Sequence, residues 1–311
     1  MKRSTFAALA GAATLAPQLA RAQALPAIRV ASTADEDIAG VLYGMEAGLF
    51  KNAGIDVQLT KLNSGAAVAA AVIGGSIDVG KSSTMQLVNA HVKGIPFVII
   101  ATAQNFRDDI LNAGLLVAKD SPIKTGKDFN GKTLSCAALG DLFSLAMAAW
   151  VDQHGGDSKT VKFVELPNAA APEAVLNGRV DGATVANPRL ADALASGKFR
   201  LLGQSFSAIA PRFMAAVFFS TADWIAKNRD AANRFRKVME TASAYINSHH
   251  AETVDMIARY SGLDPKSLAN MQRSELSAAL DPKLLQPLID RAAKYGAIPK
   301  AFDARELLDL P

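Results

Sequence analysis

The chain has 311 residues, half of them hydrophobic, and a formal net charge of +4. This length and apolar content are enough for a large buried core and favour two domains. A single cysteine, Cys136, excludes an intrachain disulfide, so packing alone must stabilise the fold. The basic excess is small and lies mostly before residue 22, so we expect no nucleic-acid partner.

Residues 1–24 have the pattern of a secretory signal peptide. Lys2 and Arg3 form a basic start, an apolar run follows at 6–15, and A-x-A sites lie at its end. The run is shorter than the ~20 residues that a membrane span needs, which favours export over an N-terminal anchor. We expect cleavage near 22–24, a mature charge of about +1 because three basic residues and no acid are lost, and a periplasmic location. The sequence leaves open whether export follows the general secretory or the twin-arginine route.

From Ile28 onward, short β-type runs alternate with helical patterns, as is typical of parallel α/β sheets. The predicted strands are 28–31, 55–59, 77–80, 97–102, 115–118, 133–136, 161–165, 180–185, 199–202 and 215–220. The predicted helices among them are 39–50, 65–73, 84–93, 142–154, 172–176 and 188–196. From Ala222 to the C-terminus the sequence predicts helices only, broken at 262–265, 281–282 and Gly296.

This order predicts an α/β fold of two lobes, each a mostly parallel sheet flanked by helices. The chain is expected to cross between the lobes at 106–112 and again at 204–213. Lobe 1 then comprises residues 25–107 and 214–311, and lobe 2 comprises residues 108–213.

A ten-residue phrase that occurs twice supports two similar lobes. Residues 71–80 read AVIGGSIDVG, and residues 174–183 read AVLNGRVDGA. Each copy ends a helical run, turns at a glycine and enters a strand through Asp78 or Asp181. Ligands of open parallel sheets bind beyond the carboxyl ends of strands, so the polar segments after both copies are expected to face one cleft. The two aspartates are interpreted as scaffold residues that bind turn amides.

Several phrases resemble, in order and spacing, those of periplasmic solute-binding proteins of ABC importers. The resemblance is to the nitrate/sulfonate/taurine type, which also includes binders of thiamin-pyrimidine precursors. The phrases are GLFKNAGIDV at 48–57, the segment 65–80, GIP at 94–96, FNGKT at 129–133 and NGRVD at 177–181. The resemblance implies a type II two-lobed periplasmic-binding-protein fold that closes on a small ligand. It also implies delivery of that ligand to an inner-membrane permease.

Three predicted helix N-termini are expected in the cleft, where free N–H groups and the helix dipole favour an anion. The first is at Ser64 and Gly65, where the serine either caps the helix, binds the ligand or does both. The second is at Ser82, Ser83 and Thr84, whose hydroxyl groups are both donors and acceptors. At least one of these three is expected to bind the ligand, and the others to cap the helix.

The third helix N-terminus lies in lobe 2, at Gly140, Asp141, Leu142 and Phe143. Sulfonate and nitrate binders of the resembled type often carry small hydroxyl residues here, whereas this chain has a carboxylate. Asp141 is interpreted first as the helix N-cap, and alternatively as a ligand contact that selects an N–H donor. Both interpretations disfavour a bare inorganic anion.

Polar residues that follow two lobe 1 strands are expected at the same edge, and one residue of lobe 2 faces them. They are Ser32, Thr33, Asp35, Gln104, Asn105 and Phe106 in lobe 1, and Asn187 in lobe 2. Phe106 and Phe143 are candidates to enclose an apolar or planar part of a ligand, although core packing is the favoured role of each.

The sequence contains no catalytic constellation. None of its four histidines lies in a nucleophile motif or at metal-ligand spacing, and no Gly-rich phosphate loop is present. We therefore expect a monomeric binding protein that is not an enzyme, with no metal and no cofactor. The expected ligand is a small organic anion such as a sulfonate. The alternative is an aromatic or heterocyclic compound such as a thiamin-pyrimidine precursor.

Overall fold

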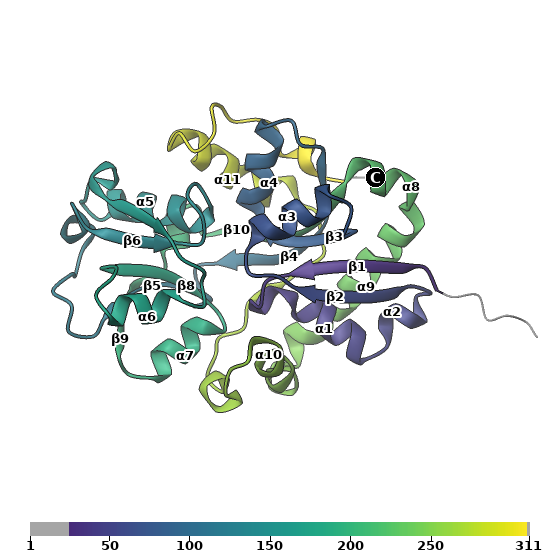
Figure 1. Ribbon diagram of the computed structural model, residues 1–311, viewed down its shortest axis with the longest axis horizontal. Coiled ribbons are helices and arrows are strands. Elements are labelled where there is room, and N and C mark those ends of the chain that lie inside the picture. Colours follow the sequence, from purple (N-terminus) through teal and green to yellow (C-terminus); the bar gives the residue numbers. More distant parts are fainter. Residues whose placement is uncertain (1–24, 310–311) are drawn as a thin grey trace, which may run out of the picture.

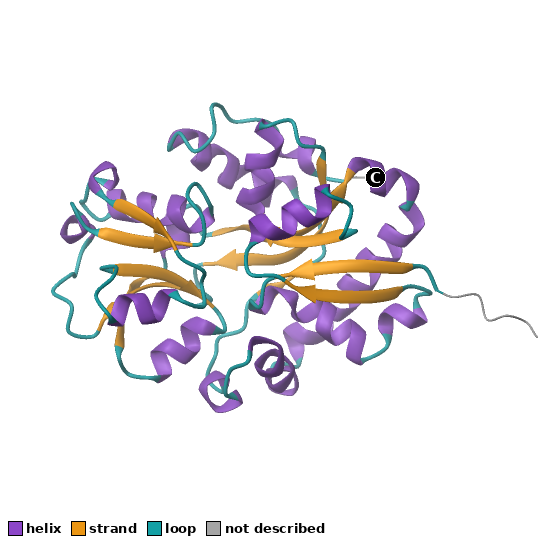
Figure 2. Ribbon diagram, in the orientation of Figure 1, coloured by secondary structure: helices purple, strands orange, loops and turns teal. Residues whose placement is uncertain are grey.

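The computed structural model describes residues 25–309, and the predicted signal peptide at 1–24 lies outside the described residues. Two β-sheets with helices packed around them lie side by side (Figures 1 and 2). The strand order is β11-β4-β10-β3-β1-β2 in the six-stranded sheet and β7-β6-β8-β5-β9 in the five-stranded sheet. The predicted α/β fold with two lobes is confirmed. Lobe 1 here means the six-stranded sheet with its helices, and lobe 2 the five-stranded sheet with its helices.

Each sheet combines parallel and antiparallel strands. Lobe 1 contains β1 (Ala27–Ser32), β2 (Asp56–Lys61), β3 (Val79–Ser83), β4 (Phe97–Arg107), β10 (Arg212–Thr221) and β11 (Glu275–Leu276). Lobe 2 contains β5 (Ala113–Ala118), β6 (Thr133–Cys136), β7 (Lys162–Glu165), β8 (Gly182–Ala186) and β9 (Phe199–Gly203). Three strands in each lobe run parallel, whereas the strands next to the crossovers, β4, β5, β9 and β10, form antiparallel pairs. The sheets are therefore less parallel than the sequence predicted.

Most predicted helices form within a few residues of their expected bounds. The helices are α1 (Ala39–Glu46), α2 (Leu49–Asn52), α3 (Gly65–Ile73), α4 (Thr84–Val92), α5 (Leu142–Gln153), α6 (Ala171–Leu176), α7 (Arg189–Ala195), α8 (Ala222–Lys227), α9 (Arg229–Ser248), α10 (Val254–Ser261) and α11 (Pro282–Lys294). The predicted helix 39–50 is interrupted because Gly48 adopts a left-handed φ of 68°. The prediction of helices only after Ala222 is wrong at 272–280, where no helix forms and the two-residue strand β11 pairs with β4.

The repeated phrase builds the same anchor in both lobes. The Asp78 carboxylate accepts a hydrogen bond from the Arg29 backbone N–H at 2.8 Å, and Asp181 accepts one from the Thr133 N–H at 2.8 Å. Each aspartate backbone N–H also donates to the carbonyl of the same partner. The scaffold role is confirmed, but the amides belong to the neighbouring strands β1 and β6 and not to turns.

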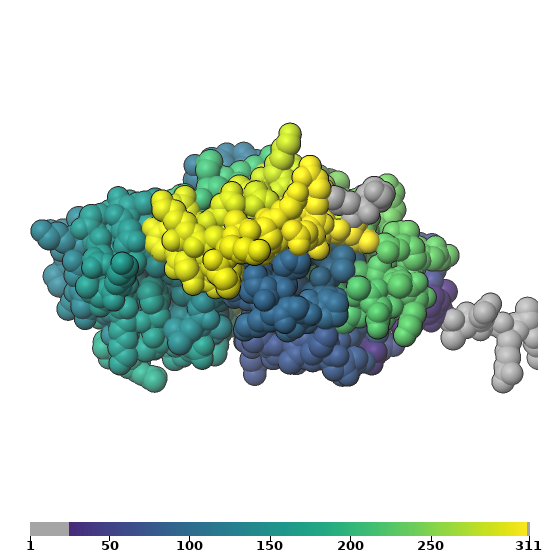
Figure 3. Space-filling view, turned by 90° about the horizontal axis from the view of Figure 1, so that it is seen from above, coloured from purple at the N-terminus to yellow at the C-terminus, as the bar shows by residue number. Residues whose placement is uncertain are grey.

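The chain passes between the sheets at 108–112 and 204–211, within the predicted crossovers. The C-terminal part, yellow in Figure 3, covers one side of the molecule and reaches the teal lobe 2. There Arg291 of α11 donates a hydrogen bond to the Ile209 carbonyl at 3.1 Å. Because the C-terminal segment contacts both lobes, the exact domain boundaries stay a prediction. Between residues 25 and 309, no helix combines the length and the apolar character needed to cross a membrane.

Candidate ligand-binding site

A cavity of about 430 Å³ lies between the lobes, with walls from both. Lobe 1 contributes the segment after β1, the N-terminus of α3 and the end of β3. Lobe 2 contributes the start of α5 and the loops after β7 and β8. The predicted site residues that line it are Thr33, Asp35, Ser64, Gly65, Ser82, Ser83, Gln104, Asp141, Leu142, Phe143 and Asn187.

Five predicted residues do not line the cavity: Ser32, Thr84, Asn105, Phe106 and Gly140. The buried Ser32 hydroxyl donates to the Thr33 carbonyl, and the Asn105 amide donates to Glu275. Thr84 is fully buried at the start of α4, and the Gly140 carbonyl accepts a hydrogen bond from Asn89. These contacts direct the polar groups into the protein and away from the cavity.

The expectation that Phe106 faces a ligand needs correction. Its ring is 0% exposed and packs against Phe206 and Phe213, with ring centroids 5.7 and 5.3 Å away. The structure confirms that Phe106 packs in the core, which was the role that the sequence analysis favoured. Phe143 alone of the two predicted phenylalanines borders the cavity.

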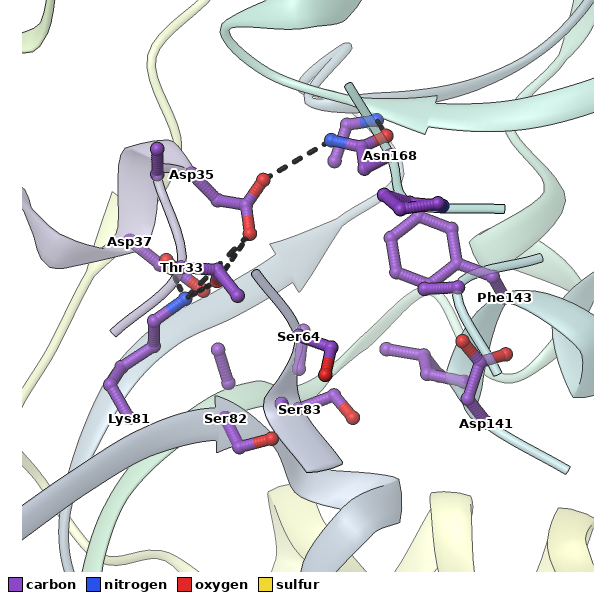
Figure 4. Close-up of a pocket in the computed structure, with 18 of the residues that line it drawn as sticks. Thr33, Asp35, Asp37, Ser64, Lys81, Ser82, Ser83, Asp141, Phe143 and Asn168 are labelled. Atoms are coloured by element: carbon purple, nitrogen blue, oxygen red, sulfur yellow. Dashed lines mark hydrogen bonds and ion pairs between the residues drawn. The ribbon is translucent and has the colours of Figure 1, made fainter. Parts of the chain in front are cut away.

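A buried lysine that the sequence analysis did not select lies in the lobe 1 wall (Figure 4). Lys81 is 2% exposed, and its Nζ lies 2.5 Å from Asp37 Oδ1 and 3.9 Å from Asp35 Oδ2. It also donates a hydrogen bond to Thr33 Oγ1 at 3.0 Å. Burial raises the pKa of Asp37, although the Lys81 ammonium opposes that rise. One ammonium thus faces two carboxylates, so the charge of Lys81 is already compensated within this wall.

Asp35 connects the two walls of the cavity. Its Oδ2 accepts a hydrogen bond from Thr33 Oγ1 at 2.6 Å, and its Oδ1 accepts one from the Asn168 amide at 3.1 Å. Asn168 follows β7 in lobe 2, and its own Oδ1 accepts the Ala186 backbone N–H. The sequence analysis missed Asn168 and Lys81. The rule that ligands meet the carboxyl ends of strands would have pointed to both. Lys81 lies two residues before the end of β3, and Asn168 lies three residues after the end of β7.

Two of the three helix N-termini are capped by side chains that line the cavity. Ser64 Oγ accepts the Ala67 N–H at the start of α3. Asp141 accepts the N–H groups of Ser144 and Ala138 at 2.8 and 2.9 Å at the start of α5. The capping interpretation is confirmed for both, while their contact with a ligand stays a prediction. Burial raises the pKa of Asp141 to about 6.

The N-terminus of α4 differs, because its N-cap residue Ser83 makes no capping hydrogen bond. Its hydroxyl lines the cavity beside Ser64, and in Figure 4 Asp141 and Phe143 lie on the opposite side. Gly65 permits this arrangement, because a Cβ there would clash with Ser82 Oγ. The cavity thus combines hydroxyl groups, carboxylates on two walls and two aromatic residues, Phe143 and Phe206.

Two further cations border the cavity, but each is bound to backbone carbonyls at the end of α10. Lys61 Nζ donates to the Tyr260 carbonyl at 3.3 Å, and Arg189 Nη2 donates to the Ser261 carbonyl at 3.1 Å. Within residues 25–309 no group of three or more His, Cys, Asp or Glu side chains could hold a metal ion. Cys136 is buried, and burial raises its pKa to about 12, so its thiol is inert.

Two α/β lobes with a cavity at the carboxyl ends of their strands define the periplasmic-binding-protein class of fold. The chain belongs to the NMT1/THI5-like family, which matches residues 35–253. None of the curated proteins compared with the sequence matches it.

Solved structures share the fold at low sequence identity. The periplasmic aliphatic sulphonate-binding protein SsuA of Escherichia coli is 19% identical, with a TM-score of 0.74 and 93% of each chain covered. The alkanesulfonate-binding protein SsuA of Xanthomonas axonopodis pv. citri is 17% identical, with a TM-score of 0.75 over 92% of this chain and 99% of that one. The periplasmic nitrate-binding protein NrtA of Synechocystis is 14% identical, with a TM-score of 0.79 over 92% and 86%.

Proposed function

We propose that this protein is the exported substrate-binding component of an ABC import system. It captures a small organic molecule between its lobes and delivers it to an inner-membrane permease. The observation that carries the proposal is the cavity of about 430 Å³ whose polar walls come from both lobes. A cavity of this size suits a small organic molecule and is larger than an inorganic ion requires. Membership of the family supports the same conclusion, as do the three structural neighbours, which are named as sulfonate- and nitrate-binding proteins.

We further propose that the ligand presents N–H or ammonium donors, as an aromatic or heterocyclic nitrogen compound does. Asp35 and Asp141 provide acceptors on opposite walls, and Phe143 provides a ring for stacking. Lys81, the buried cation in the cavity wall, already faces two carboxylates. An anion about 4 Å from the charged Asp141 would be disfavoured by roughly 1–4 kcal/mol.

A small organic anion, the first expectation from the sequence, is the second candidate. The N-terminus of α4 favours it, because the N-cap residue Ser83 lines the cavity and makes no capping hydrogen bond of its own. The two candidates differ in the sign of charge that the cavity must accept, so a panel of ligands separates them.

A thermal-shift screen of the mature chain tests the proposal. The panel contains nitrate, taurine, alkanesulfonates, aromatic acids and aminopyrimidines. A ligand at 100 times its Kd stabilises the folded protein by about 2.7 kcal/mol and raises Tm by several degrees. We expect the largest shift with a nitrogen heterocycle, recovered chemically unchanged. A shift with nitrate alone would refute the ligand class, and turnover of any compound would refute a binding protein.

A further inference from the structure

Residues 271–281, between a short 3-10 helix at Pro265–Leu268 and α11, contain no helix and include the short strand β11, although the sequence predicted helix there. Four consecutive residues among them, Gln272–Glu275, are called the strap here. In Figure 1 the yellow-green chain after α10 rises between the two sheets. Every residue of the strap makes a hydrogen bond to a segment that carries cavity residues or leads to a crossover between the lobes. Arg273 is also held by the chain before α10, because its Nη1 donates to the His250 carbonyl and to Thr253 Oγ1.

Gln272 binds a crossover segment and lobe 2. Its side-chain Oε1 accepts the Leu111 backbone N–H at 2.7 Å. Its backbone carbonyl accepts the Asn187 side-chain amide at 2.8 Å, and Asn187 lines the cavity at the end of β8. Gln272 therefore connects the strap to the first crossover and to the lobe 2 wall of the cavity.

Arg273 and Ser274 bind the loop that carries the lobe 1 carboxylates. Arg273 Nε lies 2.5 Å from Glu36 Oε1, with both side chains 2% exposed. The Ser274 hydroxyl and backbone N–H also donate to the Glu36 carboxylate, at 2.7 and 3.2 Å. Glu36 lies between Asp35 and Asp37 in sequence, so this buried ion pair fixes the position of both cavity carboxylates. The Glu36 backbone N–H also donates to the Asn187 carbonyl of lobe 2 at 3.3 Å.

Glu275 binds the two strands that lead to the crossovers. Arg107 ends β4 and Arg212 begins β10, and the two are paired directly opposite each other. Two guanidinium groups in this position repel, and Glu275 lies between them: it accepts from Arg107 Nη1 at 3.2 Å and from Arg212 Nη2 at 2.5 Å. The Asn105 amide donates to the same carboxylate at 2.9 Å.

We propose that the strap couples movement of the crossover strands to the position of the Asp35–Asp37 loop, which makes Gln272 and Glu275 positioning residues for ligand capture. The reason is that all four consecutive residues of the strap are hydrogen-bonded to neighbouring segments, so a displacement of one end of the strap moves the other end. When β4 and β10 change direction at the crossovers, Glu275 moves with them, and Arg273 and Ser274 move Glu36. Closure of the lobes and movement of the Asp35–Asp37 loop into its binding position then occur together, as one two-state transition.

The inference rests on the proposed function only for its consequence in ligand binding, so its first test needs no ligand. Glu275→Gln removes the charge between the two arginines and keeps the shape of the side chain. Hydrogen exchange of the mature protein is then measured by mass spectrometry. We expect peptides that contain Glu36 and Leu111 to exchange about tenfold faster in the variant. Glu240→Gln is the matched control, because Glu240 pairs only with the exposed Lys237 on its own helix α9.

A change confined to peptides around Arg107 and Arg212, with residue 36 unaffected, would overturn the proposal. Gln272→Ala is the second variant and is used if Glu275→Gln does not give a cooperative melt. It removes one acceptor at the surface of the strap and is expected to accelerate exchange of the same peptides, although Gln272 touches neither arginine. Unchanged exchange at residue 36 in a folded Gln272→Ala protein would equally overturn the proposal.

The distance between the lobes provides an independent readout. Ile73 in lobe 1 and Leu139 in lobe 2 are 51% and 61% exposed and accept spin labels after substitution by cysteine, while the native Cys136 is buried. Pulsed electron paramagnetic resonance should show a second population at longer distance in Glu275→Gln and a single population with Glu240→Gln. Identical distributions in both variants would contradict coupling. Once a ligand is known, Glu275→Gln should raise its Kd about tenfold, although Glu275 does not line the cavity. If the screen finds no ligand, the hydrogen-exchange rates and the distance between the lobes still test the coupling.

Discussion

The pH dependence of stability tests the structure most sharply at Asp141. This side chain is 9% exposed, and burial raises its pKa from the ordinary 3.8 to about 6. The folded state therefore binds the proton more tightly than the unfolded chain does. The stabilisation is fully present below pH 3.8 and is lost as pH rises through about 6, in total about 3 kcal/mol at roughly 1.4 kcal/mol per pKa unit.

The assay is urea unfolding of the wild type and Asp141→Asn at steps between pH 4 and pH 7.5. Asparagine still accepts the Ser144 N–H as an N-cap, so the helix α5 is retained. The free energy of unfolding of the wild type, minus that of the variant, should fall by about 3 kcal/mol from pH 4 to pH 7.5. Asp303→Asn is the control, because Asp303 is also an N-cap but exposed, and its hydrogen bond from Arg305 lowers its pKa. The free energy of unfolding of the wild type, minus that of Asp303→Asn, should rise and not fall as the pH increases.

A difference for Asp141→Asn that does not change with pH would refute this account of the site. It would mean that the two capping hydrogen bonds offset burial completely and that the carboxylate has an ordinary pKa. A ligand N–H donor would then gain nothing from relieving the cost of a buried charge on Asp141.

The remaining predictions concern single side chains in the cavity wall. Gly65→Ala places a Cβ against Ser82 Oγ and should destabilise the fold by about 1–3 kcal/mol, measured as a lower Tm. Lys81→Met leaves Asp37 buried without its cation and should cost about 3–5 kcal/mol of unfolding free energy, whereas an unchanged urea midpoint would show that the pair is not buried. Asn168→Ala removes its hydrogen bond to Asp35, one of several that join the lobes, and should increase the dissociation rate of a bound ligand about tenfold in stopped-flow measurements. An unchanged rate would mean that this bond does not hold the lobes together.

The fold was largely predictable because its determinants are local. The repeated phrase, the helix-ending glycines and the alternating apolar runs each depend on neighbours within about ten residues. They gave the lobes, most elements and the structural role of Asp78 and Asp181. The break at Gly48 was missed, because a glycine inside an apolar helical pattern gives no sign of its φ.

The strap could not be predicted, because its partners are far away in sequence. Gln272 and Leu111 are 161 residues apart, and Ser274 and Glu36 are 238 apart. No local pattern contains these pairs, so a polar stretch between two helices was read as part of a helix. The same limit applies to Phe106, because the sequence does not show whether an apolar residue at the end of a strand faces the core or a cavity.

Isothermal titration of wild type and Asp35→Asn with an aminopyrimidine and with an alkanesulfonate of similar size tests the central claim most directly. Asp35 lines the cavity and accepts a hydrogen bond from Asn168 of lobe 2, so under the proposed function its charge should determine which ligand is accepted. The account predicts that the aminopyrimidine binds the wild type with 1:1 stoichiometry and that Asp35→Asn weakens it about tenfold or more. Tighter binding of the sulfonate, strengthened further by Asp35→Asn, would contradict it.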